Sequence, residues 1–188
     1  MSTEVSLLEM LDARERRVQH QQELFEQYHK TLLCFTMNIA GPVKDSPLIR
    51  RGFAMGRQLL RQQFLRAGLT PLHTDVCMGA TGCEAFYVLD AAPLTVKKIT
   101  AAIEDATPLG RLFDMDVLRP DGAKVDREEL HLEGRKCLIC GGPAKVCSSR
   151  RIHSVAELQA KTTALLTEAV TAWDAAQIAR QAVRALKL

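Results

Sequence analysis

The chain has 188 residues, of which 47% are hydrophobic and 25% charged, the balance of an ordinary globular protein. This composition excludes a fibre or a disordered tail, and no window approaches the roughly 18 consecutive apolar residues of a membrane span. The N-terminal residues lack the pattern of a signal peptide, so a cytoplasmic protein without membrane partners is expected. The net charge of +3 is too small to indicate nucleic acid as a partner. We expect a single domain.

Helices are predicted at both ends of the chain, over 1–30 and 154–188. The first has apolar residues at helical spacing and is expected to pack through this stripe: Leu7, Leu11, Val18, Phe25 and Tyr28. At the start of the second, Ser154 and Glu157 have the spacing of a capping box.

Alternating strands and helices are predicted over 31–130. Segment 31–40 is apolar on both faces and suits an interior strand, and 47–67 reads as a helix that Pro47 opens. Strands follow at 71–78 and 84–89, joined by the turn 79–82, then a helix at 95–106 and a strand at 111–118. Because hairpin-like and crossover-like connections interleave, we expect an α+β fold with a mixed sheet packed against helices.

Two carboxylates are predicted on one face of the strand 111–118. Side chains alternate along a strand, so Asp114 and Asp116 point the same way, about 7 Å apart. Aspartate is a poor strand residue, and two like charges raise each other's pKa. A divalent hard cation such as Mg²⁺ would offset that repulsion and bridge substrate phosphates. The alternative is a pair of solvated acids, or of acids paired with arginines.

A basic loop, GPVKDS at 41–46, follows the first strand. A glycine turn before a helix N-terminus favours anions, so Gly41, Lys44, Ser46 and Arg50 are candidates for binding phosphate. Its spacing is not that of a Walker A motif. Alternatively, Ser46 simply caps the helix and Lys44 is solvated. Arg111 could join this site from the end of the later strand.

Segment 131–153 carries a cluster of metal-binding residue types. Cys137, Cys140, Cys147 and His153 have the spacing C-x2-C-x6-C-x5-H, and three thiolates with one imidazole form a closed set typical of structural zinc. The alternative is reduced thiols beside a solvated histidine. The other cysteines are interpreted as small core residues: Cys34, Cys77 and Cys83.

Three separated motifs resemble the family of holo-citrate lyase synthases, the apo-citrate lyase phosphoribosyl-dephospho-CoA transferases. They are GPVKDS at 41–46, PLGRLFDMDV at 108–117, and RKCLIC at 135–140 together with Cys147 and His153. The resemblance runs in order from about 31 to 154. One position departs from it, since the family often has histidine where this chain has Thr107.

The resemblance implies a nucleotidyltransferase-like core over 31–130. The donor would be triphosphoribosyl-dephospho-CoA and the acceptor a serine of the acyl carrier (gamma) subunit of citrate lyase, with pyrophosphate released. Asp114 and Asp116 would hold Mg²⁺ and act with Arg111 in catalysis, while Lys44, Ser46 and Arg50 would bind the departing phosphates. Asp45 and Glu84 are both candidates for a third carboxylate.

Two other functions remain open. The equivalent transferase for the malonate decarboxylase carrier would share the donor but not the acceptor. A zinc-knuckle module for nucleic acid would use the basic residues near the cysteines, but no aromatic residue lies between 135 and 154 to stack on bases.

Overall fold

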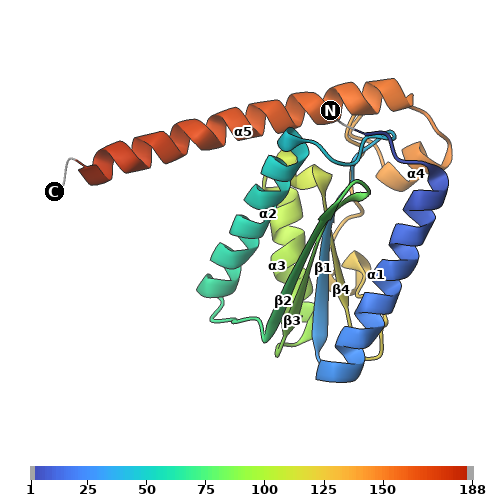
Figure 1. Ribbon diagram of the computed structural model, residues 1–188, viewed down its shortest axis with the longest axis vertical. Helices are drawn as coiled ribbons and strands as arrows, with labels where there is room; N and C mark the ends of the chain where they lie inside the picture. Colours follow the sequence, from blue (N-terminus) through green and yellow to red (C-terminus); the bar gives the residue numbers. More distant parts are fainter. Residues whose placement is uncertain (1–2, 186–188) are drawn as a thin grey trace.

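The computed structural model describes residues 3–185, with side chains from 3 to 179. Residues 186–188 of the predicted C-terminal helix lie outside this range. Within it, the elements follow one another along the chain as Figure 1 labels them: α1 (Leu7–Tyr28), β1 (Thr31–Met37), α2 (Pro47–Arg66), β2 (His73–Gly79), β3 (Gly82–Leu89), α3 (Pro93–Ala106), the 3-10 turn η1 (Leu109–Leu112), β4 (Phe113–Leu118), the 3-10 turn η2 (Arg127–Leu130), α4 (Ala144–Ser149) and α5 (Val155–Ala185).

The four strands form one sheet in the order β2-β3-β1-β4. The prediction of an interior strand is confirmed, because β1 pairs with β3 on one side and with β4 on the other. The register places Thr36 opposite Glu84 on β3 and opposite Asp114 on β4. The α+β class is therefore confirmed, and β1 aligns acidic residues from both of its neighbours.

The predicted mixed sheet is wrong, because all three strand pairings are antiparallel. Helix α2 returns the chain so that β2 runs parallel to β1, but β3 lies between these two strands. Helix α3 likewise carries the chain from β3 to β4, with β1 between them. This split βαβ arrangement, the ferredoxin-like order, keeps parallel strands from being neighbours.

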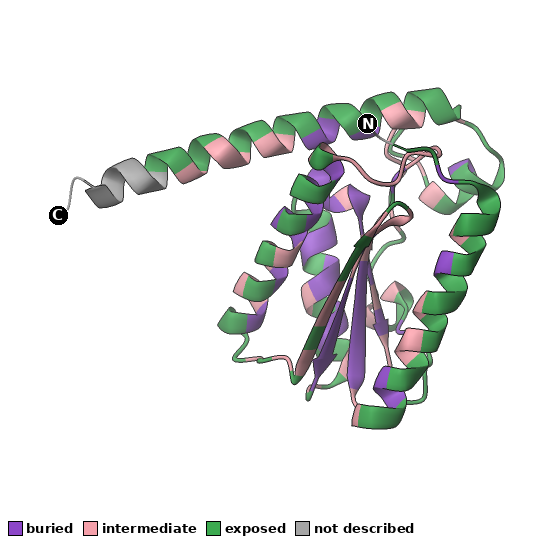
Figure 2. Cartoon of the chain, in the orientation of Figure 1, coloured by how far each residue is buried: buried purple, intermediate pink, exposed green. Residues whose placement is uncertain are grey.

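The sheet is covered on both faces (Figure 1). Helices α2 and α3 pack against one face, where the main core includes the fully buried Phe35, Phe113 and Met115. Helix α1 lies over the other face, and a smaller apolar cluster joins Leu24 of α1 to Phe86 of β3. Figure 2 shows the buried strands enclosed between these helices.

Helix α1 forms as predicted, but only the C-terminal part of its predicted stripe packs, where Phe25 is buried and Tyr28 packs against the smaller cluster. Leu7 is 75% exposed and Val18 63% exposed, and Leu11 is exposed as well. The sheet face beneath the N-terminal half of α1 is polar around Glu84, so the helix contacts it through a charged side chain. Arg17 donates two hydrogen bonds to Glu84, at 2.8 and 2.5 Å. The exposed apolar side chains in the N-terminal half of α1 therefore have no apolar surface of the described sheet to pack against.

The free edge of β4 is closed by side chains from α3. The Met115 N–H donates to the carboxylate of Glu104 at 2.9 Å, and the Met115 carbonyl accepts from Lys97 at 3.4 Å. Both α3 side chains are buried. A further backbone bond runs from the Val125 N–H to the Val117 carbonyl, at 2.8 Å. These bonds fix the strand that carries the two aspartates.

The C-terminal helix α5 begins with the predicted capping box. The Ser154 hydroxyl accepts from the Glu157 N–H at 3.2 Å, and the Glu157 carboxylate accepts from the Ser154 N–H at 2.8 Å. The helix packs on α2 and η1 and then extends beyond the body of the molecule (Figure 1). No helix in the described part of the chain is long and apolar enough to cross a membrane.

Two of the three cysteines outside the Cys/His segment lie in the core. Cys34 and Cys83 are buried, as expected of small apolar residues. Cys77 is exposed on β2, so its interpretation as a core residue is wrong. It lies on an edge strand, where the outer positions face solvent.

Candidate active site

The two aspartates of β4 lie on the face that α1 covers. Side chains along β4 alternate between buried and partly exposed, so Asp114 and Asp116 share the more exposed face. Thr36 of β1 stands in register between Asp114 and Glu84. A row of polar side chains therefore crosses three strands, from β4 through β1 to β3.

The charge on Asp114 is only partly compensated. Burial, followed by the negative charge of Asp116, raises the pKa of Asp114 above its ordinary value, although nearby cations oppose the change. The nearest of these is Arg135, whose Nη1 lies 3.6 Å from Asp114 Oδ1. Asp116 has a closer partner, since the Lys124 ammonium lies 2.6 Å from its Oδ1. A carboxylate in this state is stabilised by a further cation.

A small cavity of about 170 Å³ joins Asp114 to the basic loop. Lys44 lines it together with Asp114 and Glu84, and Arg14 and Arg17 of α1 close its other side. The Lys44 ammonium donates to the Ile39 carbonyl at 2.5 Å. Burial, followed by the positive charge of Arg14, lowers the pKa of Lys44. The cavity thus holds cations and carboxylates side by side.

The other residues of the basic loop have local roles. Ser46 caps α2 by accepting from the Ile49 N–H at 3.2 Å, which is the alternative that the sequence left open. Arg50 is paired with Asp45, with two hydrogen bonds of 2.7 and 2.6 Å. Gly41 has a left-handed φ of +83°, which allows the turn after β1. Neither Ser46 nor Arg50 lines a described cavity that contains Asp114.

The structure separates the two candidates for a third carboxylate. Glu84 lines the small cavity with Asp114, where Arg17 holds it. Asp45 is engaged by Arg50, which keeps its pKa low, and does not line that cavity. Only Glu84 is placed beside the aspartate pair.

Asp114 and Asp116 together line a second, larger cavity of about 510 Å³. Five cations line this cavity: Lys97, Lys124, Arg127, Arg135 and Lys145. Five carboxylates line it as well: Glu104, Asp114, Asp116, Asp126 and Glu128. The charges of the walls therefore balance, and a phosphate-bearing ligand would be attracted most strongly when the aspartates also hold a cation.

Arg111 is not brought to the aspartates. It lies in η1, before β4 begins, and lines a third cavity of about 540 Å³ between η1, the Cys/His segment and the start of α5. Just upstream, the Thr107 hydroxyl accepts from the Gly110 N–H at 3.2 Å and so braces the same turn. Arg135 lines both this third cavity and the larger cavity of Asp114.

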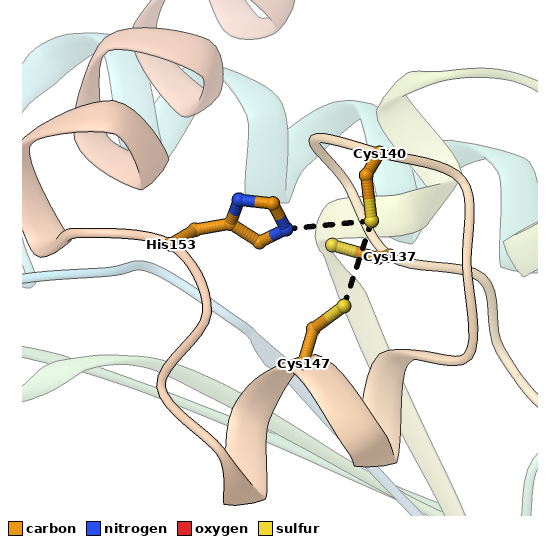
Figure 3. Close-up of side chains that lie close together, drawn as sticks. All are labelled: Cys137, Cys140, Cys147 and His153. Atoms are coloured by element: carbon orange, nitrogen blue, oxygen red, sulfur yellow. Dashed lines mark hydrogen bonds between the residues drawn. The ribbon is translucent and has the colours of Figure 1, made fainter.

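The Cys/His residues do come together (Figure 3). The ligand atoms of Cys137, Cys140, Cys147 and His153 all lie within 4.8 Å of one another, so this group could hold a metal ion. The Cys140 sulfur lies 3.5 Å from that of Cys147 and 3.4 Å from Nε2 of His153. Zn–S bonds of about 2.3 Å at tetrahedral angles place two sulfurs about 3.8 Å apart. The observed spacing is close to that value.

The thiols of this cluster perturb one another. Burial raises the pKa of Cys137, but the backbone N–H groups of Cys140 and Ile139 and the neighbouring thiols lower it to about 6. Burial and the side chains of Cys140 and Cys137 raise the pKa of Cys147 to about 12. Three thiolates therefore cannot coexist here unless a cation stabilises them.

Several residues of the cleft escape sequence reasoning. Lys97 and Glu104 lie seven residues apart on α3, and two charged residues on the inner side of a helix are a weak signal of a buried pair. Lys124 and Arg127 follow the turn after β4, where a charged residue normally faces solvent. Arg135 belongs to the RKCLIC motif and to the basic residues near the cysteines, but nothing in its spacing places it beside Asp114.

A carboxylate pair with lysines and arginines in the same cleft is an arrangement suited to an enzyme that acts on a phosphate-bearing substrate. Comparison with known proteins identifies the family. The family described as apo-citrate lyase phosphoribosyl-dephospho-CoA transferase matches residues 5–169, and the chain belongs to it.

Individual relatives agree with this assignment. The chain is 34% identical to the apo-citrate lyase phosphoribosyl-dephospho-CoA transferase of Citrobacter koseri over 165 residues, 88% of this chain and 90% of the relative. It is 33% identical to the protein of the same name from Escherichia coli strain SE11, over 87% of this chain and 90% of the relative. It is also 34% identical to "Protein CitXG" of Haemophilus influenzae, of whose length the match spans 35%.

Proposed function

We propose that this chain transfers the phosphoribosyl-dephospho-CoA group from triphosphoribosyl-dephospho-CoA to a serine of the acyl carrier (gamma) subunit of citrate lyase. Family membership supports the reaction. The observation that carries the assignment of the site is the position of Asp114 and Asp116, on one face of β4 and in the wall of a cleft that also holds lysines and arginines.

The reaction exchanges a phosphoanhydride bond of the donor for a phosphate ester bond to the carrier. The serine oxygen forms a bond to the α-phosphorus of the donor, the bond from that phosphorus to the pyrophosphate oxygen breaks, and the serine proton leaves to a base. Charge builds up on the departing pyrophosphate, and fixed cations stabilise it. Lys124 and Arg135 lie within 4.0 Å of the aspartates, Lys44 lines the small cavity with Asp114, and we assign these three cations this role.

We propose that Asp114 and Asp116 hold Mg²⁺. Two carboxylates on one strand face, with the pKa of one raised by the other, fit a hard divalent cation. When bound, the ion would neutralise phosphate oxygens of the donor. Of the two candidates for a third carboxylate, we favour Glu84, because it alone shares a cavity with Asp114.

We propose further that the Cys/His cluster binds zinc in a structural role. The four ligands form a closed set with no position left for substrate. The segment that carries them is short on core residues, since Cys147 is its one buried residue between 131 and 153. Metal binding would therefore supply much of its folding energy.

The test uses purified protein, the donor, Mg²⁺ and apo-carrier, with the carrier mass measured by mass spectrometry. The expected result is a carrier heavier by one phosphoribosyl-dephospho-CoA group, with one pyrophosphate released per carrier. A carrier whose acceptor serine is replaced by alanine should gain nothing. The malonate decarboxylase carrier is the specificity control. Preferential labelling of that carrier, or no labelling of either, would overturn the proposal.

A further inference from the structure

The cavity of about 540 Å³ that Arg111 lines shares Arg135 with the site described above, but its other charged residues have no role assigned there. It lies between η1, the Cys/His segment and the first turn of α5. Its volume falls within the range of small-molecule sites, about 300–1,000 Å³. Arginines and apolar side chains share its walls: Arg111, Arg135, Arg151, Leu112, Leu138 and Leu158.

Two of the three arginines in this cavity have no acidic partner in the described part of the chain. Among the side chains from 3 to 179, neither Arg111 nor Arg151 has an acidic partner within 4.0 Å. Burial, followed by the positive charge of Arg135, lowers the pKa of Arg111. Guanidinium groups that line one cavity without an acidic partner favour a phosphate-bearing ligand, which each can bind through paired N–H groups.

Arg135 connects this cavity to the aspartates. Its Nη2 donates to the carbonyls of Phe113 at 2.6 Å and of Arg111 at 3.0 Å, which fixes the guanidinium at the start of β4. Its Nη1 lies 3.6 Å from Asp114. A ligand held in the cavity would therefore lie next to the carboxylate pair.

The backbone at Arg151 supports a role for its side chain. Arg151 follows α4 with a left-handed φ of +49°, at a position where helices commonly end in glycine. Its N–H bonds to the Ser148 carbonyl at 3.2 Å, and the next residue bonds to Cys147 at 3.0 Å. A side chain at this position costs conformational energy, yet it lines the cavity.

From these contacts we infer that the cavity binds the adenosine diphosphate end of the donor. The diphosphate would lie on Arg111 and Arg151, and the adenine would pack between Leu112, Leu138 and Leu158. The reacting part of the donor would extend past Arg135 to the aspartates. This inference rests on the proposed function, because it assigns the part of the donor that does not react. It also gives the Cys/His segment a role, as one wall of a nucleotide site.

The test is equilibrium binding of dephospho-CoA, ADP and adenosine, measured by titration calorimetry. Arg151→Ala should weaken dephospho-CoA and ADP by about tenfold or more, the effect of losing a charge-assisted hydrogen bond, and leave adenosine nearly unchanged. Arg150→Ala is the matched control, since Arg150 is exposed and lines neither cavity. It should bind all three compounds as the wild type does. Unchanged melting temperature and metal content would show that Arg151→Ala is folded.

Asp114→Asn separates this inference from the proposed function. It should lose transfer and still bind dephospho-CoA with wild-type affinity. If wild-type protein transfers the group but Arg151→Ala leaves both dephospho-CoA affinity and the donor KM unchanged, the inference is wrong and the proposed function stands. If wild-type protein neither transfers the group nor binds dephospho-CoA, both are wrong. Equal losses in Arg150→Ala and Arg151→Ala would show nonspecific attraction and overturn the inference.

Discussion

Glu104 is the residue whose loss should most disturb the strand that carries the aspartates. Its carboxylate accepts from the Met115 N–H at 2.9 Å and lies 3.1 Å from Nη1 of Arg127, and its side chain is only 4% exposed. Lys97, also buried, bonds to the carbonyl of the same methionine. In Glu104→Ala the Met115 N–H and Arg127 would lose this partner, and buried Lys97 would lose a nearby negative charge.

The expected cost follows from these contacts. Removing one member of a buried ionic group destabilises a protein by about 3–5 kcal/mol, mainly because the remaining charges stay buried. For a chain of this length that corresponds to a fall in Tm of roughly 10 °C. The matched control is Asp105→Ala, which removes the other partner of Arg127. Asp105 is 46% exposed, so its loss should cost less than about 1 kcal/mol.

Urea unfolding followed by circular dichroism measures both variants against the wild type. The reasoning requires Glu104→Ala to be several times more costly than Asp105→Ala. Equal and small losses in both would refute it, because they would show that the edge of β4 does not depend on the buried carboxylate.

Three further predictions concern the turn before β4, the metal cluster and the aspartates. Gly110→Ala should destabilise the fold by about 2 kcal/mol or more, since its Cβ would lie 2.5 Å from backbone carbonyls, whereas Gly134→Ala, with open space, should be neutral in thermal unfolding. Cys147→Ser, or a chelator, should remove zinc in elemental analysis and lower Tm; Cys77→Ser should do neither, and a stable metal-free wild type would contradict this. Because burial and a neighbouring acid raise the pKa of metal-free Asp114, Mg²⁺ affinity measured by titration should begin to fall on acidification at a pH above the ordinary 3.8, and an affinity that is constant down to that pH would contradict the assignment.

Those features that depend on short-range periodicity could be predicted from the sequence. The strand pleat places Asp114 and Asp116 on one face, and the spacing of Ser154 and Glu157 predicts the capping box at α5. The cysteine spacing likewise brings the four ligand atoms together. Each of these features involves residues that are close in the chain or constrained by one element.

Features that depend on packing between distant segments could not be predicted. The strand between β1 and β2 is β3, which comes later in the chain, so crossover lengths alone suggested parallel neighbours. The apolar residues in the N-terminal half of α1 resemble a packing face, but the sheet opposite them carries Glu84, and Arg17 makes the contact instead. Arg135 reaches Asp114 across 21 positions of sequence, through a turn whose geometry no local pattern specifies.

The most direct test of the account is to measure whether the Asp114→Asn variant transfers the phosphoribosyl-dephospho-CoA group to the apo-carrier. The wild-type charge is disfavoured by burial and by Asp116, so its removal should leave Tm equal or higher. The account predicts that this variant is folded but adds no mass to the apo-carrier in the presence of donor and Mg²⁺. Asp90 is exposed and follows the C-terminal end of β3, the end away from Glu84, so the Asp90→Asn variant should label the carrier fully. Labelling by Asp114→Asn at the wild-type rate would contradict the central claim.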